Sequence, residues 1–273
     1  MKVLKFGGTS LGDSTRMQNV ANIVSQQGRV IVVLSAIAGT TDSLVKISDA
    51  YKHGEFKQVN EIVDVLLKHY RRYVDSLYEF PANKHDAMQF VESQFAEIKE
   101  ANIESATSAL EFHILAKGEM ISTELFSIYL KEQGSNAKLI SALDFLRLTQ
   151  GNIPDENFLS SQLSQIISDN SPVDIFVTQG FICRNAFGEI CNLKRGGSDY
   201  SASLIGAAIE AEEVQIWTDI DGMHNNDPRY IPNTKPIREL SFDEAAELAY
   251  FGAKILHPSS IKPARKKSIP VRL

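Results

Sequence analysis

The stretch Lys5–Ser10, which reads KFGGTS, decides the fold because it ends a strand and opens a glycine turn. The apolar residues of Met1–Phe6 predict a short β-strand before the turn, and Ser14 or Thr15 is expected to cap a helix after it. A strand, a glycine turn and a helix N-terminus present backbone N–H groups that suit an anion, above all phosphate. Lys5 adds a positive charge at the mouth of that turn. An ordinary tight turn explains this segment, taken alone, equally well.

Strand and helix patterns alternate along much of the chain, which is typical of a largely parallel sheet covered by helices. Arg29–Ser35 (RVIVVLS) predicts a buried strand, and a turn of small residues leads from it into a helix that begins near Asp42. The segment RNAFG lies between two short strands, so it predicts a β-hairpin and a mixed sheet. Further strands are expected over Ala137–Ser141, Val173–Thr178, Phe181–Cys183, Glu189–Asn192 and Glu213–Thr218.

The middle of the chain is predicted to be helical. Phe56–Tyr78 and Lys84–Gln133 have the pattern of two long helices, and Pro81 separates them. Another helix is expected over Asp155–Asp169. Because no flexible linker flanks the long helices, we expect a helical cover inserted between strands and not a separate domain.

The composition limits the class of protein. A chain of 273 residues that is 43% hydrophobic can bury a substantial core, and a net charge of −6 argues against a nucleic-acid partner. No apolar run approaches the ~20 residues of a membrane span, and no signal peptide precedes the first strand. Cys183 and Cys191 flank the hairpin turn and are expected to be reduced. A soluble, cytoplasmic protein is the resulting expectation.

A second glycine turn follows a strand at Lys194–Ser201, which reads KRGGSDYS. Ser198 is the expected N-cap of the next helix, and Arg195 can grip a carboxylate with two hydrogen bonds. Asp199 either complements the helix dipole or holds a neighbouring lysine in place. Two such anion sites in one α/β chain suit a phosphate donor and a second anionic reactant.

A third polar segment, Trp217–Arg229 (WTDIDGMHNNDPR), directly follows a predicted strand. In open α/β sheets the ligand crevice lies beyond the carboxyl ends of the strands, so these side chains suit ribose hydroxyls, phosphates or a cation. The D-x-D-G pattern lacks the later glutamate of a calcium loop. Farther on, the predicted helix Phe242–Tyr250 ends at a glycine. Lys254 follows it and has an ordinary explanation as a charge that complements the helix dipole.

These segments belong to a set of motifs that occur in a fixed order. The motifs are KFGGTS, the turn over Leu34–Thr41, KGEM at Lys117–Met120, TQGF at Thr178–Phe181, RGGSDYSA, WTDIDG, DPR and FGAKILHP. Together they resemble the catalytic domain of aspartate kinases in the amino-acid-kinase superfamily. The resemblance runs from the first residues to the last, although Tyr51–Leu110 contributes little to it.

The resemblance implies a single α/β catalytic domain over residues 1–273, a three-layer α/β/α sandwich around a mainly parallel sheet. Its N-terminal part would bind the amino acid, and its C-terminal part, from about residue 195 to 273, would bind ATP. The implied reaction transfers the γ-phosphoryl group of ATP to the side-chain carboxylate of L-aspartate. This is the first step towards lysine, threonine and methionine. The carboxylate is already ionised at neutral pH, so the reaction needs charge neutralisation and positioning, not a general base.

The resemblance also implies roles for individual residues. Lys5 and Asp199 would be catalytic, with Lys5 on the transferring phosphoryl group. Arg195 would bind the α-carboxylate of aspartate and Glu119 its α-ammonium. Thr41 and Ser198 would complete the amino-acid site. The implied ATP site comprises Lys5, Gly7, Gly8, Thr218, Asp219, His224, Arg229, Lys254 and Ile255, and Mg²⁺ would be held mainly by phosphates and water.

The chain departs from the family pattern at two positions. His224 stands near where a tyrosine is frequent, and Lys194 stands where a glycine is common. The sequence ends at IPVRL within a predicted strand, so regulatory domains are expected to be absent. The alternatives are another kinase of the superfamily and a non-catalytic sensor of ATP or an amino acid. A homo-oligomer is compatible with each of them.

Overall fold

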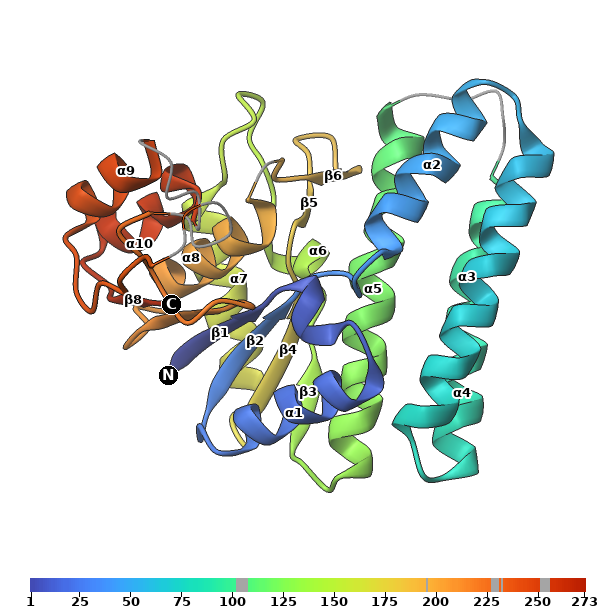
Figure 1. Cartoon of the computed structure of the whole chain (residues 1–273), viewed down its shortest axis with the longest axis horizontal. Coiled ribbons are helices and arrows are strands. Elements are labelled where there is room, and N and C mark those ends of the chain that lie inside the picture. The colour runs from blue at the N-terminus through green and yellow to red at the C-terminus, as the bar shows by residue number, and fades with distance from the viewer. Residues whose placement is uncertain (102–107, 195, 227–230, 232, 251–255) are drawn as a thin grey trace.

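The computed structural model describes residues 1–101, 108–194, 196–226, 231, 233–250 and 256–273. Among these residues, a central sheet has the strand order β3-β4-β2-β1-β7-β8, and every pairing in it is parallel. Helices cover both faces of this sheet (Figure 1). The predicted three-layer α/β/α sandwich is confirmed.

The strands of the central sheet are short, and the inner strand β2 is wholly apolar. Each residue of β2 is buried, which explains its unbroken run of Val, Ile and Leu. In the register, Lys5 lies beside Val33 of β2 and Ile216 of β7, so the ends of these strands meet at one edge. The strands are β1 (Lys2–Phe6), β2 (Val30–Leu34), β3 (Ala137–Leu139), β4 (Ile175–Gln179), β7 (Val214–Trp217) and β8 (Val271–Arg272).

One face of the sheet packs against a helical layer that carries most of the N-terminal half. Leu4 and Phe6 of β1 belong to the same apolar core as Met17 of α1 and Phe126 of α5. The helices α3 and α4 pack against α2 and α5, and they stand beyond α5 at the side of the molecule (Figure 1). The bounds are α1 (Ser14–Ser25), α2 (Thr40–Lys52), α3 (Phe56–Leu77), α4 (Pro81–Lys99) and α5 (Ser108–Glu132).

The other face packs against helices from the C-terminal half. Val3 of β1 and Ile31 of β2 join a core that includes Leu163 of α7 and Ile205 of α8. The helices α9 and α10 lie at the outer end of this layer (Figure 1). The bounds are α6 (Ala142–Phe145), α7 (Glu156–Asp169), α8 (Gly197–Ala208), α9 (Phe242–Tyr250), the 3₁₀ helix η3 (Pro258–Ile261) and α10 (Lys262–Lys266).

The predicted mixed sheet is wrong. The hairpin strands β5 (Ile182–Arg184) and β6 (Ile190–Asn192) form a separate antiparallel pair beside the central sheet. Cys183 and Cys191 face each other across this pair, and both are buried free thiols, as expected. The hairpin separates because Phe181, which has a positive φ of 66°, turns the chain away from β4.

The helix boundaries also differ from those predicted. The segment predicted as one helix over Lys84–Gln133 contains two helices, α4 and α5, and Pro81 opens α4 as its first residue. A 3₁₀ helix, η1 (Gly8–Leu11), separates β1 from α1, and Asp13 caps α1 in place of the predicted Ser14 or Thr15. The Asp13 carboxylate accepts a hydrogen bond from the Arg16 backbone N–H at 2.9 Å.

The helix α8 begins at a glycine and not at the predicted serine cap. Gly196 is the N-cap, with a φ of 68°, and Ser198 lies inside the first turn. The Ser198 hydroxyl therefore does not cap the helix; it accepts a hydrogen bond from Ser35 Oγ. Within the residues described, no helix is both long enough and apolar enough to cross a membrane.

Candidate active site

A cavity of about 300 Å³, which we call the central cavity, lies where β1 and β2 end. Six separate segments of the chain meet there, from β1 to the first turn of α8. Its lining is Lys5, Ser35, Thr41, Glu119, Phe181, Lys194, Gly196, Gly197, Ser198 and Asp199. The structure thus brings Lys5 and Asp199, expected to be catalytic, together with three residues expected to bind the amino acid, Thr41, Glu119 and Ser198.

Lys5 and Asp199 form the charged centre of the cavity. The Lys5 ammonium lies 2.7 Å from Asp199 Oδ1, and their side chains are 12% and 19% exposed. Lys5 reaches this position because it points to the opposite face of β1 from Leu4 and Phe6, towards α8. Asp199 contacts a lysine and also lies in the first turn of α8, so the geometry fits both roles considered for it.

Glu119 of α5 is buried, and its carboxylate enters the cavity from the helical layer. Oε1 accepts a hydrogen bond of 3.2 Å from the backbone N–H of Ala36, in the turn after β2. Burial raises the pKa of Glu119 to about 8, although the hydrogen bond from Ala36 acts in the opposite direction. The side chain is therefore poised to exchange a proton near neutral pH.

The residue before Glu119 explains how α5 approaches the cavity so closely. A Cβ on Gly118 would lie 2.7 Å from the Ala36 Cβ, so only glycine fits against this turn. Lys117 points the other way, and its ammonium binds Glu97 and Gln94 of α4. In the motif KGE, Lys117 therefore binds α4. Gly118 allows α5 to approach the turn after β2, and Glu119 lines the central cavity.

Serine hydroxyls connect the end of β2 to α8 and α5. Ser35 Oγ donates a hydrogen bond to Ser198 Oγ at 3.0 Å, and Ser122 Oγ donates one to the Ser35 carbonyl at 2.8 Å. Gly180 is required beside Ser198, because a Cβ there would lie 2.6 Å from Ser198 Cβ. Thr41, in the first turn of α2, is exposed at the mouth of the cavity.

The first glycine turn packs tightly against the second strand. A Cβ on Gly8 would lie 2.7 Å from the Ala36 carbonyl oxygen, and one on Gly7 would lie 3.6 Å from the Lys5 ammonium. The Gly7 N–H donates a hydrogen bond of 3.4 Å to the Trp217 carbonyl, which ties this turn to the end of β7. Gly7 therefore lies next to the cation of the cavity, and Gly8 lies against the turn after β2.

The residues assigned to ATP do not all line the central cavity. Thr218 lies at the end of β7 and lines a neighbouring cavity of about 280 Å³ with Trp217, and its hydroxyl contacts Asp219 at 3.1 Å. His224 is buried within its own loop. Its Nδ1 lies 2.8 Å from Thr234 Oγ1, and its Nε2 lies 2.7 Å from Asp221 Oδ1.

Four of the assigned residues cannot be placed in either cavity. Arg195, Arg229, Lys254 and Ile255 lie outside the described residues. The strands β1 and β7 are adjacent, and the rings of Phe6 and Trp217 stack 5.7 Å apart. A ligand that spans both strand ends would contact both groups of residues.

Ser35 and Phe181 line the cavity but had no assigned role. Ser35 directly follows the fully buried run VIVVL, and the carboxyl end of such a strand is where ligands are bound in open α/β sheets. The position of Ser35 directly after this strand could therefore have predicted that it lies in a ligand site. Phe181 belongs to the motif TQGF, but its positive φ becomes visible only in the structure.

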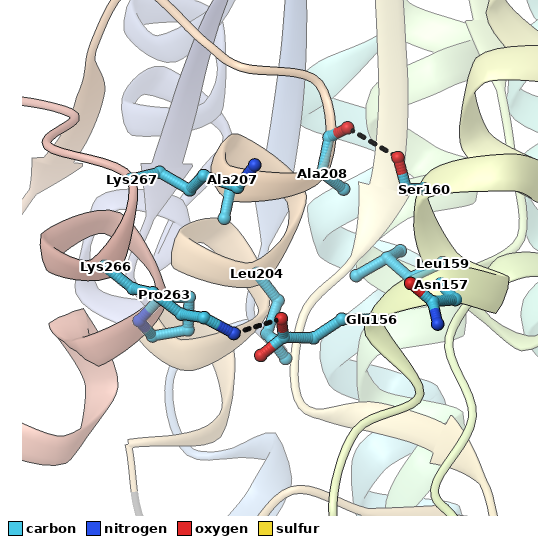
Figure 2. A pocket seen from close by; sticks show the side chains of 10 residues that line it. All are labelled: Glu156, Asn157, Leu159, Ser160, Leu204, Ala207, Ala208, Pro263, Lys266 and Lys267. Atoms are coloured by element: carbon cyan, nitrogen blue, oxygen red, sulfur yellow. Dashed lines mark hydrogen bonds and ion pairs between the residues drawn. The ribbon is translucent and has the colours of Figure 1, made fainter.

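A cavity of about 160 Å³ on the far side of α8 has a different character (Figure 2). Leu159 and Leu204 form its apolar part, and the Lys266 ammonium lies 2.7 Å from Glu156 Oε2 at its edge. None of the residues assigned to the reaction lines it. Within the described part of the chain, no group of three or more His, Cys, Asp or Glu side chains could hold a metal ion.

The chain matches known proteins over its whole length. The model of the "Amino acid kinase family" matches residues 1–273. The lysine-sensitive aspartokinase 3 of Escherichia coli is 34% identical over 274 residues, which cover 98% of this chain and 60% of that protein. The bifunctional aspartokinase/homoserine dehydrogenase of Buchnera aphidicola is 30% identical over 99% of this chain and 34% of that protein.

The chain also resembles solved structures of aspartokinases. The crystal structure of E. coli aspartokinase III in complex with aspartate and ADP superposes with a TM-score of 0.87. It is 33% identical, and the match covers 99% of this chain and 61% of that one. The chain thus spans about 60% of the length of this E. coli relative. The fold, the central cavity and the match over all residues lead to one conclusion: the chain belongs to the amino acid kinase family.

Proposed function

We propose that this chain is an aspartate kinase, which transfers the γ-phosphoryl group of ATP to the side-chain carboxylate of L-aspartate. The observation that carries the proposal is the convergence of Lys5, Glu119, Ser198 and Asp199 on one cavity. The E. coli relative with the same fold was solved in complex with aspartate and ADP, which supports the same choice of substrates. By this proposal, the enzyme serves the biosynthesis of lysine, threonine and methionine in the cytoplasm.

The charges of the cavity suit this transfer. An oxygen of the aspartate carboxylate attacks the γ-phosphorus, the bond from that phosphorus to the bridging oxygen breaks, and ADP leaves. Because a carboxylate with a pKa near ~4 is already ionised, no side chain has to remove a proton. The main obstacle is repulsion between anions, and the Lys5 ammonium offsets it, held in position by Asp199.

The other end of aspartate is proposed to bind between Glu119 and Arg195. Glu119 is a buried carboxyl group that gains a partner when an α-ammonium enters the cavity. Thr41 and Ser198 supply hydroxyl groups beside it. This arrangement would select a zwitterionic amino acid over a simple dicarboxylate.

The nucleotide is proposed to lie across the ends of β1 and β7. Gly7, Gly8 and Lys5 would face its phosphates, and Thr218, Asp219, His224, Arg229, Lys254 and Ile255 would contact the remainder. Mg²⁺ would take its ligands from phosphates and water. Of the carboxylates that line the described cavity, Asp199 is paired with Lys5 and Glu119 is bonded to Ala36.

The test is to trap the acyl phosphate. The purified chain is incubated with ATP, MgCl₂, L-aspartate and hydroxylamine, and the aspartyl hydroxamate is measured. We expect hydroxamate in proportion to the ADP formed, and little of it with succinate, which lacks the α-ammonium. Equal use of succinate would contradict the role of Glu119. Binding of ATP and aspartate with no hydroxamate would show a sensor in place of a kinase.

A further inference from the structure

Lys194 lines the central cavity, and its backbone has a conformation that is unfavourable for a lysine. Its φ is 61°, in the left-handed region that favours glycine. Hydrogen bonds fix its backbone on both sides. Its N–H donates to Asn192 Oδ1 at 3.0 Å, and its carbonyl accepts from the Gly197 N–H at 3.0 Å. The loop therefore holds a long cationic side chain at the cavity wall.

The charges around Lys194 show what this side chain can do. Lys5 is neutralised by Asp199 at 2.7 Å. Lys194 is exposed and lines the same cavity, and among the described residues no carboxylate lies within ion-pair distance of its ammonium. Glu119 lines the cavity too, but it is buried and bonded to the Ala36 N–H. Lys194 thus adds a cation that no described carboxylate offsets.

We propose that the Lys194 ammonium binds a carboxylate of the amino-acid substrate and so increases the affinity of the cavity for that substrate. The proposal rests on the proposed function, because it takes aspartate as the acceptor. A carboxylate is the chemical class that fits. Lys194 lines the wall together with Thr41, Glu119 and Ser198, and the α-ammonium and α-carboxylate share one carbon atom. The contact forms on binding, so it acts on KM for the amino acid and not on kcat.

The test compares three substitutions at this position. Lys194→Met removes the charge, Lys194→Arg keeps it, and Lys194→Gly removes it while relieving the backbone. We expect Lys194→Met and Lys194→Gly to raise KM for aspartate about three- to tenfold, the scale of one exposed charge contact near 4 Å. KM for ATP and kcat should stay within twofold, and Lys194→Arg should remain close to the parent.

Two controls separate charge from backbone. Ser268→Gly relieves a positive φ of 54° away from the cavity, so it should raise the melting temperature, as Lys194→Gly does, with KM unchanged. Lys68→Met removes an exposed charge from α3 and should leave KM unchanged. An unaltered KM for aspartate in Lys194→Met would overturn the proposal. A rise in KM for ATP alone would overturn it too.

Calorimetry keeps the test independent of turnover. Aspartate is titrated into the parent chain and into Lys194→Met, each in the presence of ADP. Weaker aspartate binding in the variant supports the role of Lys194 even if the parent forms no hydroxamate, which would refute only the kinase. Equal binding overturns the role of Lys194 whether or not the kinase is active. Failure of the parent chain to bind aspartate would overturn both.

Discussion

At the scale of single residues, Glu119 is the most unusual group in the cavity. It is a buried carboxyl group whose described partner is one backbone N–H, and burial raises its pKa to about 8. The unfolded chain loses this proton near pH 4.5, whereas the folded chain keeps it until about pH 8. The contribution of Glu119 to stability therefore falls as pH rises through this window.

Replacing Glu119 by glutamine should remove this pH dependence. A glutamine can accept the same Ala36 hydrogen bond without a charge, so Glu119→Gln should be more stable than the parent at pH 8 by a few kcal/mol. The difference in unfolding free energy should be much smaller at pH 5, close to the pKa of 4.5 in the unfolded chain. Urea unfolding of both proteins at the two pH values measures it. A difference in unfolding free energy between the two proteins that is the same at both pH values would contradict the raised pKa of Glu119.

Aspartate binding should release a proton from the same residue. At pH 7 most Glu119 side chains are protonated, and an entering α-ammonium favours the carboxylate, so about one proton leaves for each aspartate bound. Calorimetry in two buffers of different ionisation enthalpy counts these protons. Glu119→Gln should release none, and the parent should release fewer at pH 9. Proton uptake by the parent at pH 7 would disprove the pairing.

At the scale of elements, the approach of α5 to the turn after β2 positions Glu119. Gly118→Ala should test this contact, because the new Cβ would lie 2.7 Å from the Ala36 Cβ and 3.3 Å from Leu44 Cδ1. The overpacking, which costs about 1–3 kcal/mol, outweighs the gain of about 1 kcal/mol in helix propensity. We expect a lower melting temperature and a higher KM for aspartate.

Gly151→Ala is the matched control for this substitution. The new Cβ would meet nothing closer than Ile153 Cδ1 at 3.7 Å, in an exposed loop. Its stability should change by less than about 0.5 kcal/mol, with no change in KM. A more stable Gly118→Ala with an unchanged KM would show that close packing of α5 does not position Glu119.

The elements also show which parts of the fold the sequence could predict. The buried run of β2 and the glycine turns at Gly7 and Gly196 carry strong local signals, so these strands and turns lie where expected. The helix caps were missed because Asp13 and Ser14 are both good capping residues, and tertiary packing chooses between them. The hairpin leaves the main sheet through the positive φ of Phe181, which no local pattern predicts.

At the scale of the whole molecule, parallel strands place their carboxyl ends at one edge, and this brings distant segments together. Lys5 and Asp199 are far apart in sequence yet lie 2.7 Å apart, because β1 packs against α8. Sequence motifs indicated the chemical character of these residues. Their spatial pairing could not be read from spacing, since it depends on how α8 crosses the sheet.

The proposed division between the two reactants also depends on the whole molecule. The central cavity at the ends of β1 and β2 contains the groups assigned to aspartate. Thr218 lines the neighbouring cavity at the end of β7. Lys5 lines the central cavity from β1, the strand that pairs with both β2 and β7. By the proposed function, Lys5 would face the transferring phosphoryl group.

The most direct test of this account is the hydroxamate rate of Lys5→Ala beside that of the parent chain, at saturating ATP and aspartate. Loss of the cation that faces the transferring group should lower kcat on the order of 10²–10³-fold, the scale of removing one electrostatic stabiliser. The affinity for ADP, measured by calorimetry, should change much less. A Lys5→Ala chain that folds, binds ADP and forms hydroxamate at the parent rate would contradict the account.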